Sequence, residues 1–253
     1  MPLLGAFIVP HPPLIVPEVG KGRETGIKST VRAYEKIGQK IAEASPETII
    51  VISPHSVIYG DYIHISPGRS ARGSLKNFGV PGVIMEKKYD ADFAEALGEE
   101  AELNGIPAGT LGERDPSLDH GVLVPLYFID RYFKKEYKLI RLSISGLTFL
   151  EHYRFGKCIS DVSDRLSRRI VIVASGDLSH KLTPSGPYGY CAEGPEFDAR
   201  AVGAMKSGDF SVFLNFGEEF CEKAAECGLR SFVEMAGALD GKAVRPDFLS
   251  YEG

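Results

Sequence analysis

The hydrophobic positions of the chain form short, continuous runs that alternate with longer amphipathic runs. The segments "ETIIVIS" and "RIVIVAS" are apolar and β-branched throughout, which is typical of strands that are buried on both faces of a sheet. By the same criteria we expect strands at 4–9, 48–53, 62–66, 82–85, 138–143 and 170–174. These runs predict the central strands of an α/β fold.

The longer runs between the strands carry apolar residues at helical spacing and predict helices. The helix expected at 26–44 ends before Ser45-Pro46, and the next begins with Asp90, a good helix cap. Helices are expected at 26–44, 90–105, 120–133, 148–168, 194–208, 218–226 and 229–241. Two Gly/Pro-rich stretches, 66–82 and 181–195, are predicted as long loops, which in a compact domain are often functional.

Composition narrows the class of protein. The chain has 253 residues and a net charge of −5, and we find no repeat or polar linker in it, so we expect one domain over 1–253. The acidic balance argues against a nucleic-acid partner. No run of about 18 apolar residues could span a membrane, and the N-terminus lacks the basic region of a signal peptide. Four cysteines without a close pair indicate reduced thiols, so we expect a cytoplasmic protein.

Three of the six histidines lie where an apolar strand ends. His11 follows "AFIVP", His55 follows "VISP", and His180 follows "IVIVASGDLS". Ligands of open α/β sheets bind at the carboxyl ends of the strands, and imidazole is a common metal ligand and a good acid–base group near neutral pH. Prolines beside His11 and His55 restrict the backbone there. We therefore expect a metal or catalytic site at this edge of the sheet.

The remaining histidines differ in their surroundings. His120 lies in a loop or first helical turn, and the preceding Asp119 can accept a hydrogen bond from it. Asp177 lies three residues before His180, so in a helical turn its carboxylate would orient that imidazole. His64 alternates within a strand and His152 lies within a helix, and we interpret both as structural.

A metal held by two histidines needs a third ligand. Glu226 lies at the predicted break between the last two helices, where its side chain can turn toward the sheet, and Cys227 beside it is an alternative donor. Glu252 and Glu193 are competing carboxylates. On the residues alone, Glu226 is explained better as part of a solvated helix face, so the third ligand stays open at this point.

The motifs "VPHPPLIVPEVG", "VISPHS", "LDHGVLVPL", "ASGDLSHKL" with "GPYGY", and "AECGLRSF" together resemble class III extradiol dioxygenases of the LigB type, and in particular the LigB/Memo-like domain of AmmeMemoRadiSam system proteins. The resemblance runs from residue 8 to residue 239. It implies a mixed central β-sheet with helices on both faces and a mononuclear non-haem Fe(II) site. His11 and His55 match the two histidine ligands, and Glu226 falls near the carboxylate ligand.

The same resemblance implies roles for the other site residues. His180 matches the acid–base histidine, with Asp177 beside it, and His120 matches a second active-site histidine. Two histidines and one carboxylate leave positions open on Fe(II) for substrate and dioxygen. The expected activity is therefore that of an oxidoreductase that opens the ring of a small catechol-like aromatic substrate with dioxygen.

Two alternatives remain open. Memo proteins share the histidine pattern but have a cysteine where Cys227 lies, which would make this chain a copper- or iron-binding redox, peptide- or metabolite-binding protein without ring cleavage. A zinc hydrolase could use the same ligands with a metal-bound water as nucleophile. In AmmeMemoRadiSam proteins a second domain follows, so we also expect a C-terminal partner domain and a longer protein. Homo-oligomers are compatible with the sequence.

Overall fold

A four-stranded parallel sheet forms the centre of the computed structural model, which describes residues 2–253. Its strands, in spatial order, are β1 (Leu3–Val9), β8 (Ile170–Ser175), β2 (Thr48–Ser53) and β7 (Lys138–Ser143). Parallel neighbours need long crossover connections, which the helices supply. Because β8 lies between β1 and β2, the two strands that come first in the sequence are joined only through β8. This strand begins 161 residues after β1 ends.

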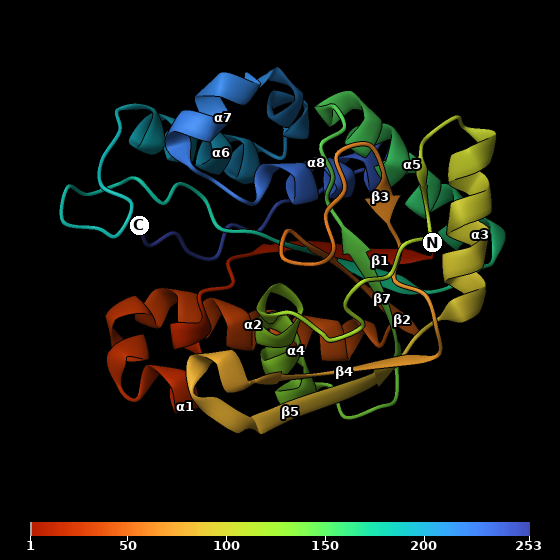
Figure 1. Ribbon diagram of the computed structural model, residues 1–253, viewed down its shortest axis with the longest axis horizontal. Helices are drawn as coiled ribbons and strands as arrows, with labels where there is room; N and C mark the ends of the chain where they lie inside the picture. The colour runs from red at the N-terminus through yellow and green to blue at the C-terminus, as the bar shows by residue number, and fades with distance from the viewer. Residues whose placement is uncertain (1) are drawn as a thin grey trace.

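Helices cover both faces of the sheet (Figure 1). Alternate strand residues point to opposite sides: Ile50 and Ile172 belong to one hydrophobic core, and Ile49 and Val171 belong to the other. The strands are therefore apolar at nearly every position, as their sequences predict. The first core packs under α3 (Ala91–Leu103), α5 (Phe149–Arg165), α6 (Glu193–Ser207), α7 (Glu218–Ala224) and α8 (Leu229–Ala238), and the second packs under α1 (Pro17–Gly20), α2 (Lys28–Ala44) and α4 (His120–Tyr132).

Helix ends follow the local chemistry of the sequence. The side chain of Thr148 accepts a hydrogen bond from the Glu151 amide while Glu151 reaches back to Thr148, a capping box that begins α5. Helices α5 and α8 cross closely because Gly156 lies against Gly237 and the α8 backbone, and a Cβ on Gly156 would come within 1.9 Å of the Glu234 carbonyl oxygen. Substitution of this glycine would therefore separate the two helices.

Smaller strands lie beside the central sheet. They are β3 (Ile63–His64), which pairs with β6 (Ala108–Gly109), and the antiparallel hairpin of β4 (Ser70–Leu75) and β5 (Val80–Lys88). The four central strands all run parallel, and an antiparallel bridge between Ile65 and Leu142 at the β7 edge adds the mixed character that was expected. Short 3-10 turns occur at Pro13–Ile15, Arg23–Ile27, Lys76–Phe78 and Phe210–Asn215.

The predicted elements are confirmed with three exceptions, the first being the four-residue helix α1, which was not predicted. The six expected strands and seven expected helices are present, with most helices a few residues shorter than predicted. The stretch 66–82 was wrongly predicted as loop, because it holds β4 and the start of β5; β4 has only alternate buried positions, which a search for apolar runs does not detect. The two-residue strand β6 was missed as well. Within residues 2–253, no helix has the length and apolar character needed to cross a bilayer.

Candidate metal centre

Three histidines meet at the carboxyl edge of the central sheet. His11 follows β1, His55 follows β2, and His120 is the first residue of α4. The Nε2 atoms of His11 and His55 are 2.9 Å apart, and the rings of His55 and His120 stack with centroids 4.1 Å apart. One nitrogen from each of the three lies within 4.8 Å of the others. We refer to His11, His55 and His120 as the histidine cluster.

The strand register explains why these segments meet. Val9 pairs with Ser175 at the end of β8, so the chain after β1 runs beside the chain after β8. There the His11 amide donates to Asp177 Oδ1 at 2.8 Å, and His11 Nδ1 lies 2.9 Å from Ser175 Oγ. Tyr34 of α2 donates to the carbonyl of Pro10. These bonds occupy Nδ1 and direct His11 Nε2 toward His55.

A second set of donors lies on the other side of His11. Cys227 Sγ is 3.7 Å from His11 Nε2, and Asp177 Oδ2 is 3.9 Å from the same nitrogen. The Asp177 amide donates to Cys227 Sγ at 3.2 Å, which fixes the thiol against the end of β8. His11, Asp177 and Cys227 form a second group of mutually close donor atoms, and His11 belongs to both groups.

His180 is oriented for proton transfer. Its Nδ1 is hydrogen-bonded to the carbonyl oxygen of Ala225, so Nδ1 carries the proton of the neutral ring and Nε2 is free to accept one. Nε2 lies 3.6 Å from Asp177 Oδ2. The Asp177 carboxylate favours the protonated ring, in which Nε2 can donate to it, and so raises the pKa of His180 above its ordinary value. This imidazole can therefore take up a proton near neutral pH.

The pKa values of the three histidines of the cluster are shifted downward, in the opposite direction to that of His180. Burial lowers the pKa of His11 to about 4, and partial desolvation lowers the pKa values of His55 and His120 as well. Neutral imidazole is the form that binds metals. Burial also raises the pKa of the Cys227 thiol to about 12. Near neutral pH this thiol therefore gives up its proton only when a bound cation replaces it.

Two of the separations from His11 are those expected for a pair of ligands on one metal ion. Two imidazole nitrogens that bind one metal at right angles are about 3.0 Å apart, because each metal–nitrogen bond is about 2.1 Å, and the His11–His55 separation is 2.9 Å. A nitrogen and a thiolate sulfur at a tetrahedral angle are about 3.6 Å apart, and the His11–Cys227 separation is 3.7 Å. Each pair alone suits a transition-metal ion, but His55 and Cys227 belong to different donor groups, so the two separations describe two neighbouring pairs that share His11.

The expected carboxylate ligands lie outside both donor groups among residues 2–253. Glu226 Oε2 accepts a hydrogen bond of 2.6 Å from the Leu229 amide at the start of α8, and burial raises its pKa. Glu252 accepts hydrogen bonds from Thr30 in the first turn of α2. Glu193 contacts the Cys191 thiol. The role of Glu226 as third ligand stays a prediction. Cys227, unlike Glu226, belongs to a donor group with His11.

The two histidines that were interpreted as structural lie away from these donor groups. His64 is buried in β3, where its amide donates to Ser143 Oγ at 2.9 Å. His152 is buried in α5; its Nδ1 lies 2.9 Å from the Thr148 carbonyl oxygen and its Nε2 accepts from the Ser145 amide at 3.1 Å. The carbonyl can only accept, so His152 is neutral with the proton on Nδ1.

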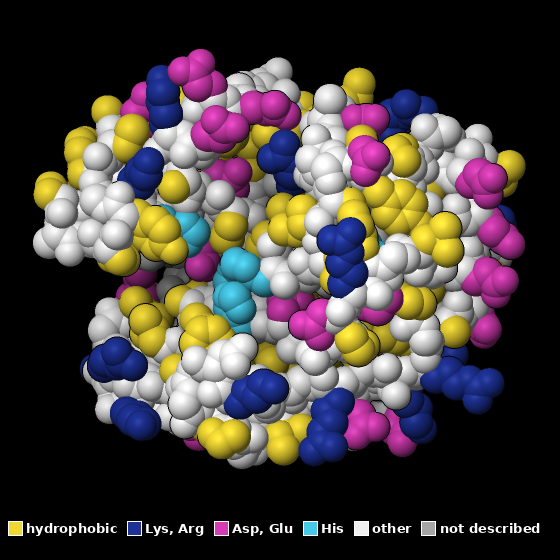
Figure 2. Space-filling view, in the orientation of Figure 1, with side chains coloured by type: hydrophobic (Ala, Val, Ile, Leu, Met, Phe, Trp, Pro, Cys, Tyr) yellow, Lys and Arg dark blue, Asp and Glu magenta, His cyan; other side chains and the backbone are white. Residues whose placement is uncertain are grey.

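The histidine cluster opens into a cleft between the two helical layers, where histidine side chains reach the surface (Figure 2). Aromatic residues lie beside the histidines on both sides. The Phe78 ring is 5.2 Å from that of His120, and the Tyr188 ring is 5.0 Å from that of His180. Phe78 and Tyr188 are 37% and 60% exposed. Both come from the Gly/Pro-rich stretches, which the sequence singled out without identifying these rings.

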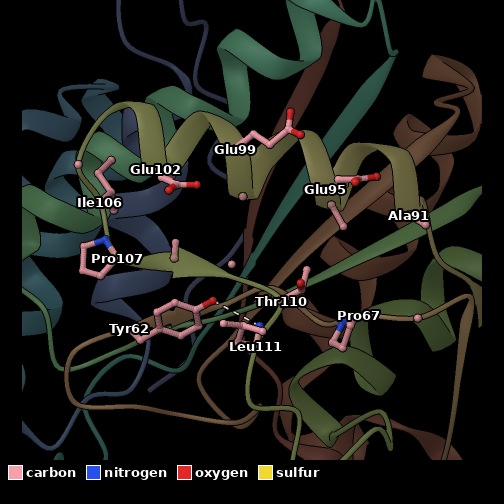
Figure 3. Close-up of a pocket in the computed structure, with 16 residues that line it drawn as sticks. Tyr62, Pro67, Ala91, Glu95, Glu99, Glu102, Ile106, Pro107, Thr110 and Leu111 are labelled. Carbon is pink, nitrogen blue, oxygen red and sulfur yellow. Dashed lines mark hydrogen bonds between the residues drawn. The ribbon is translucent and has the colours of Figure 1, made fainter.

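A separate hollow of about 900 Å³ lies under α3 (Figure 3). Glu95, Glu99 and Glu102 of α3 line it together with Tyr62. It contains neither histidine nor cysteine, so it lacks the nucleophiles and metal donors that the histidine cluster provides. The histidine cluster is therefore the better candidate for the chemistry of the protein than this hollow.

The chain is similar to known proteins along nearly its whole length. Residues 5–253 match the family model described as the catalytic LigB subunit of aromatic ring-opening dioxygenase. Protein CA_C1420 of Clostridium acetobutylicum is 38% identical over 260 residues, covering all of this chain and 55% of that protein, so the chain spans about half the length of this relative. The 2-aminophenol 1,6-dioxygenase beta subunit of a Pseudomonas species is 26% identical over 94% of this chain and 85% of its own.

Two further similarities are more distant. A MEMO1 family protein of Thermococcus onnurineus is 28% identical over 78% of this chain and 68% of its own length. The crystal structure of the uncharacterized protein JW3007 from Escherichia coli superposes with a TM-score of 0.54 at 20% identity, covering 83% of this chain and 82% of the other. The latter shows a shared fold alone.

Proposed function

Since the chain belongs to the LigB family of aromatic ring-opening dioxygenases, we propose that it is a non-haem Fe(II) enzyme that opens an aromatic ring carrying two adjacent polar substituents. The substrate class is a catechol or a 2-aminophenol, and dioxygen is the second substrate. One observation carries the proposal: His11, His55 and His120 converge at the carboxyl edge of the sheet, with the Nε2 atoms of His11 and His55 2.9 Å apart.

We assign the metal to His11 and His55, and the third donor to Cys227 in place of the predicted Glu226; because Cys227 shares a donor group with His11 but not with His55, its side chain must turn toward His55 when metal binds. The support is the 3.7 Å distance from Cys227 Sγ to His11 Nε2, together with the hydrogen bond that occupies Glu226. A thiolate carries the same single negative charge as a carboxylate, so either donor leaves Fe(II) with a net charge of +1. Iron held there would be chelated by the two adjacent substituents and would supply an open position for dioxygen beside them.

Two histidines beside the proposed metal have different roles in proton transfer. His180 Nε2 has a free lone pair and a carboxylate 3.6 Å away that stabilises its protonated form, so it is suited to take the proton of the substrate hydroxyl. His120 stays neutral because desolvation lowers its pKa. A neutral imidazole at the edge of the cluster can donate a hydrogen bond to the ring substituent or to the incoming oxygen.

The aromatic side chains beside the histidines suit a flat substrate. Phe78 and Tyr188 lie next to His120 and His180, respectively. An aromatic ring between them would gain offset or edge-to-face contacts while its polar substituents face the histidines. The family relationship and this arrangement both favour an aromatic substrate of small size.

The test is turnover by metal-loaded protein. The protein is reconstituted without oxygen using one equivalent of Fe(II), then mixed with catechol, 4-methylcatechol or 2-aminophenol and air. Ring opening gives a coloured semialdehyde product and consumes one dioxygen per substrate. Protein that holds iron but consumes no oxygen with any of these compounds would contradict the proposal.

A second candidate function is carried by Cys227. A thiolate is a softer ligand than a carboxylate and favours copper or zinc as well as iron, and a MEMO1 family protein is among the relatives. In this candidate the same site binds a metal and a metabolite or peptide without ring cleavage. Metal analysis of protein purified without added metal separates the cases. Copper retained through Cys227 with no oxygen uptake supports this function, and zinc with esterase activity supports a hydrolase.

A further inference from the structure

A single buried arginine anchors the segment that leads into His120. Arg141 lies in the middle of β7 and is 1% exposed. Its guanidinium group donates to Ser66 Oγ at 2.5 Å, the Ser117 carbonyl at 2.5 Å and the Asp115 carbonyl at 3.0 Å. It also forms an ion pair of 3.0 Å with Glu113. Three of these four acceptors belong to residues 113–117.

The segment of residues 111–117 has little else to hold it. It forms no helix or strand, and most of its residues are exposed, with Leu111 78% exposed. Tyr59 donates to the Gly112 carbonyl at its beginning. The Leu111 amide also donates to Tyr62 Oη at 3.3 Å, and the Arg114 guanidinium lies 4.8 Å from the centroid of the Tyr59 ring. The remaining hydrogen bonds, from the Asp115 and Ser117 amides to the Glu113 and Asp115 carboxylates, lie within the segment. Its position over the sheet therefore depends chiefly on Arg141.

The end of this segment is continuous with the site. Leu118 is buried, and its amide donates to the Arg72 carbonyl. Asp119 caps α4 and accepts a hydrogen bond of 2.6 Å from Ser53 Oγ. Ser53 Oγ in turn accepts from the His55 amide at 3.2 Å. His120 follows immediately as the first residue of α4.

We propose that Arg141 is a positioning residue that fixes His120 over the metal site through the 111–117 segment. The proposal rests on the proposed function only for the catalytic part played by His120. Lysine cannot replace Arg141, because one ammonium group cannot reach acceptors that are spread around a planar guanidinium. The metal donors His11, His55 and Cys227 come from other segments, so the effect falls on His120 and Asp119 and reaches His55 only through the Ser53 hydroxyl.

The first arm of the test needs no activity. Metal-free wild type, Arg141→Lys and Glu113→Gln are digested briefly with trypsin, and the cut after Arg114 is followed by mass spectrometry. Arg114 is exposed and lies within the anchored segment. We expect cleavage there to be at least tenfold faster in Arg141→Lys and moderately faster in Glu113→Gln. Arg165→Lys, at the end of α5, weakens a surface ion pair with Glu100 of α3; it serves as the matched control and should leave this cut unchanged.

The second arm separates positioning from a general loss of structure. Fe(II) affinity should stay within threefold of wild type in Arg141→Lys, while kcat for ring opening falls at least tenfold. The Arg141→Lys/His120→Ala double variant should be no slower than His120→Ala alone, because both changes remove the same contribution. If Arg141→Lys does not fold, Glu113→Gln is paired with His120→Ala in the same way.

Several results would overturn the inference: an unchanged cut after Arg114, loss of iron in Arg141→Lys, or losses that multiply in the double variant. Failure of the proposed function looks different. In that case no variant, including wild type, opens any of the aromatic substrates, and the trypsin arm still decides whether Arg141 holds the segment. Anaerobic binding of 4-nitrocatechol to metal-loaded protein then replaces kcat as the readout of His120.

Discussion

Metal binding by this protein should release one proton, and the proton should come from Cys227. At pH 7, a His11 imidazole with a pKa of about 4 is protonated in only about one molecule in a thousand. A Cys227 thiol with a pKa of about 12 is ionised in only about one molecule in a hundred thousand. Binding of Fe(II) or Zn(II) through His11 and Cys227 therefore releases almost no proton from the imidazole and one proton from the thiol.

The sign of the pH dependence follows from the same values. Between pH 4 and pH 12 the free site carries one more proton than the metal-bound site, so affinity should rise about tenfold for each pH unit across the measurable range of pH 6 to 8. Deprotonating the thiol at pH 7 costs about 7 kcal/mol, which is five pKa units at 1.36 kcal/mol each. The metal–thiolate bond must exceed this cost.

Titration calorimetry in buffers of different ionisation enthalpy measures the number of protons directly. Wild type and Glu226→Gln should each release about one proton per Zn(II), and Cys227→Ala should release close to none and bind more weakly. His180, with a raised pKa, can add a fraction of a proton in all three proteins, so the difference between Cys227→Ala and wild type is the quantity to compare. Equal proton release in these two proteins, or loss of metal by Glu226→Gln alone, would refute the assignment of Cys227 and restore Glu226.

Three other predictions follow from the described contacts. His180→Ala should keep its iron but lose roughly 10²–10⁴-fold in kcat, as expected for a general base; loss of metal in this variant would make His180 a ligand instead. Phe78→Ala should raise the KM of an aromatic substrate about three- to tenfold with a smaller effect on kcat, and an unchanged KM would remove Phe78 from the substrate site. Burial lowers the pKa of His152 to about 4, so the unfolded chain binds the extra proton and stability falls as pH drops from 6.5 toward 4. Urea unfolding of metal-free protein should show a loss of about 2 kcal/mol at pH 5 from this group, absent in His152→Gln, and equal losses in both proteins would mean that His152 is charged in the folded state.

The sequence predicts the buried strands well because burial on both faces constrains every position. β2 was predicted with the bounds that the structure shows, since all six of its residues are buried. β4 was not predicted, because alternate residues of this strand are exposed. It also contains Gly73, where a larger residue would not fit, since a Cβ would come within 2.4 Å of the Leu118 carbonyl oxygen. That requirement arises from a segment distant in sequence and leaves no local pattern.

The site residues likewise divide into those that a local sequence pattern predicts and those that depend on distant segments. His11, His55 and His180 could be predicted because each follows a buried strand, and parallel strands bring their carboxyl ends to one edge. The choice between Glu226 and Cys227 could not be made, since these neighbours point to different sides of a turn that begins with Ala225 in the left-handed conformation, at φ 52°. Arg141 was indistinguishable within "KLIRLS", because its hydrogen-bond partners lie at 66 and 113–117.

The position of β8 between β1 and β2 has a consequence during synthesis of the protein. β1 leaves the ribosome first but has to wait for β8, whose first residue lies 161 positions after the last of β1. At translation rates of about 5–20 residues per second this delay is roughly 8–30 s. Until then the strands that lead to His11 and His55 lack the strand that joins them, and Cys227 is made later still. The nascent chain therefore carries an apolar N-terminal strand without a partner, a natural target for chaperones, and metal can enter the complete site only after translation has passed Cys227.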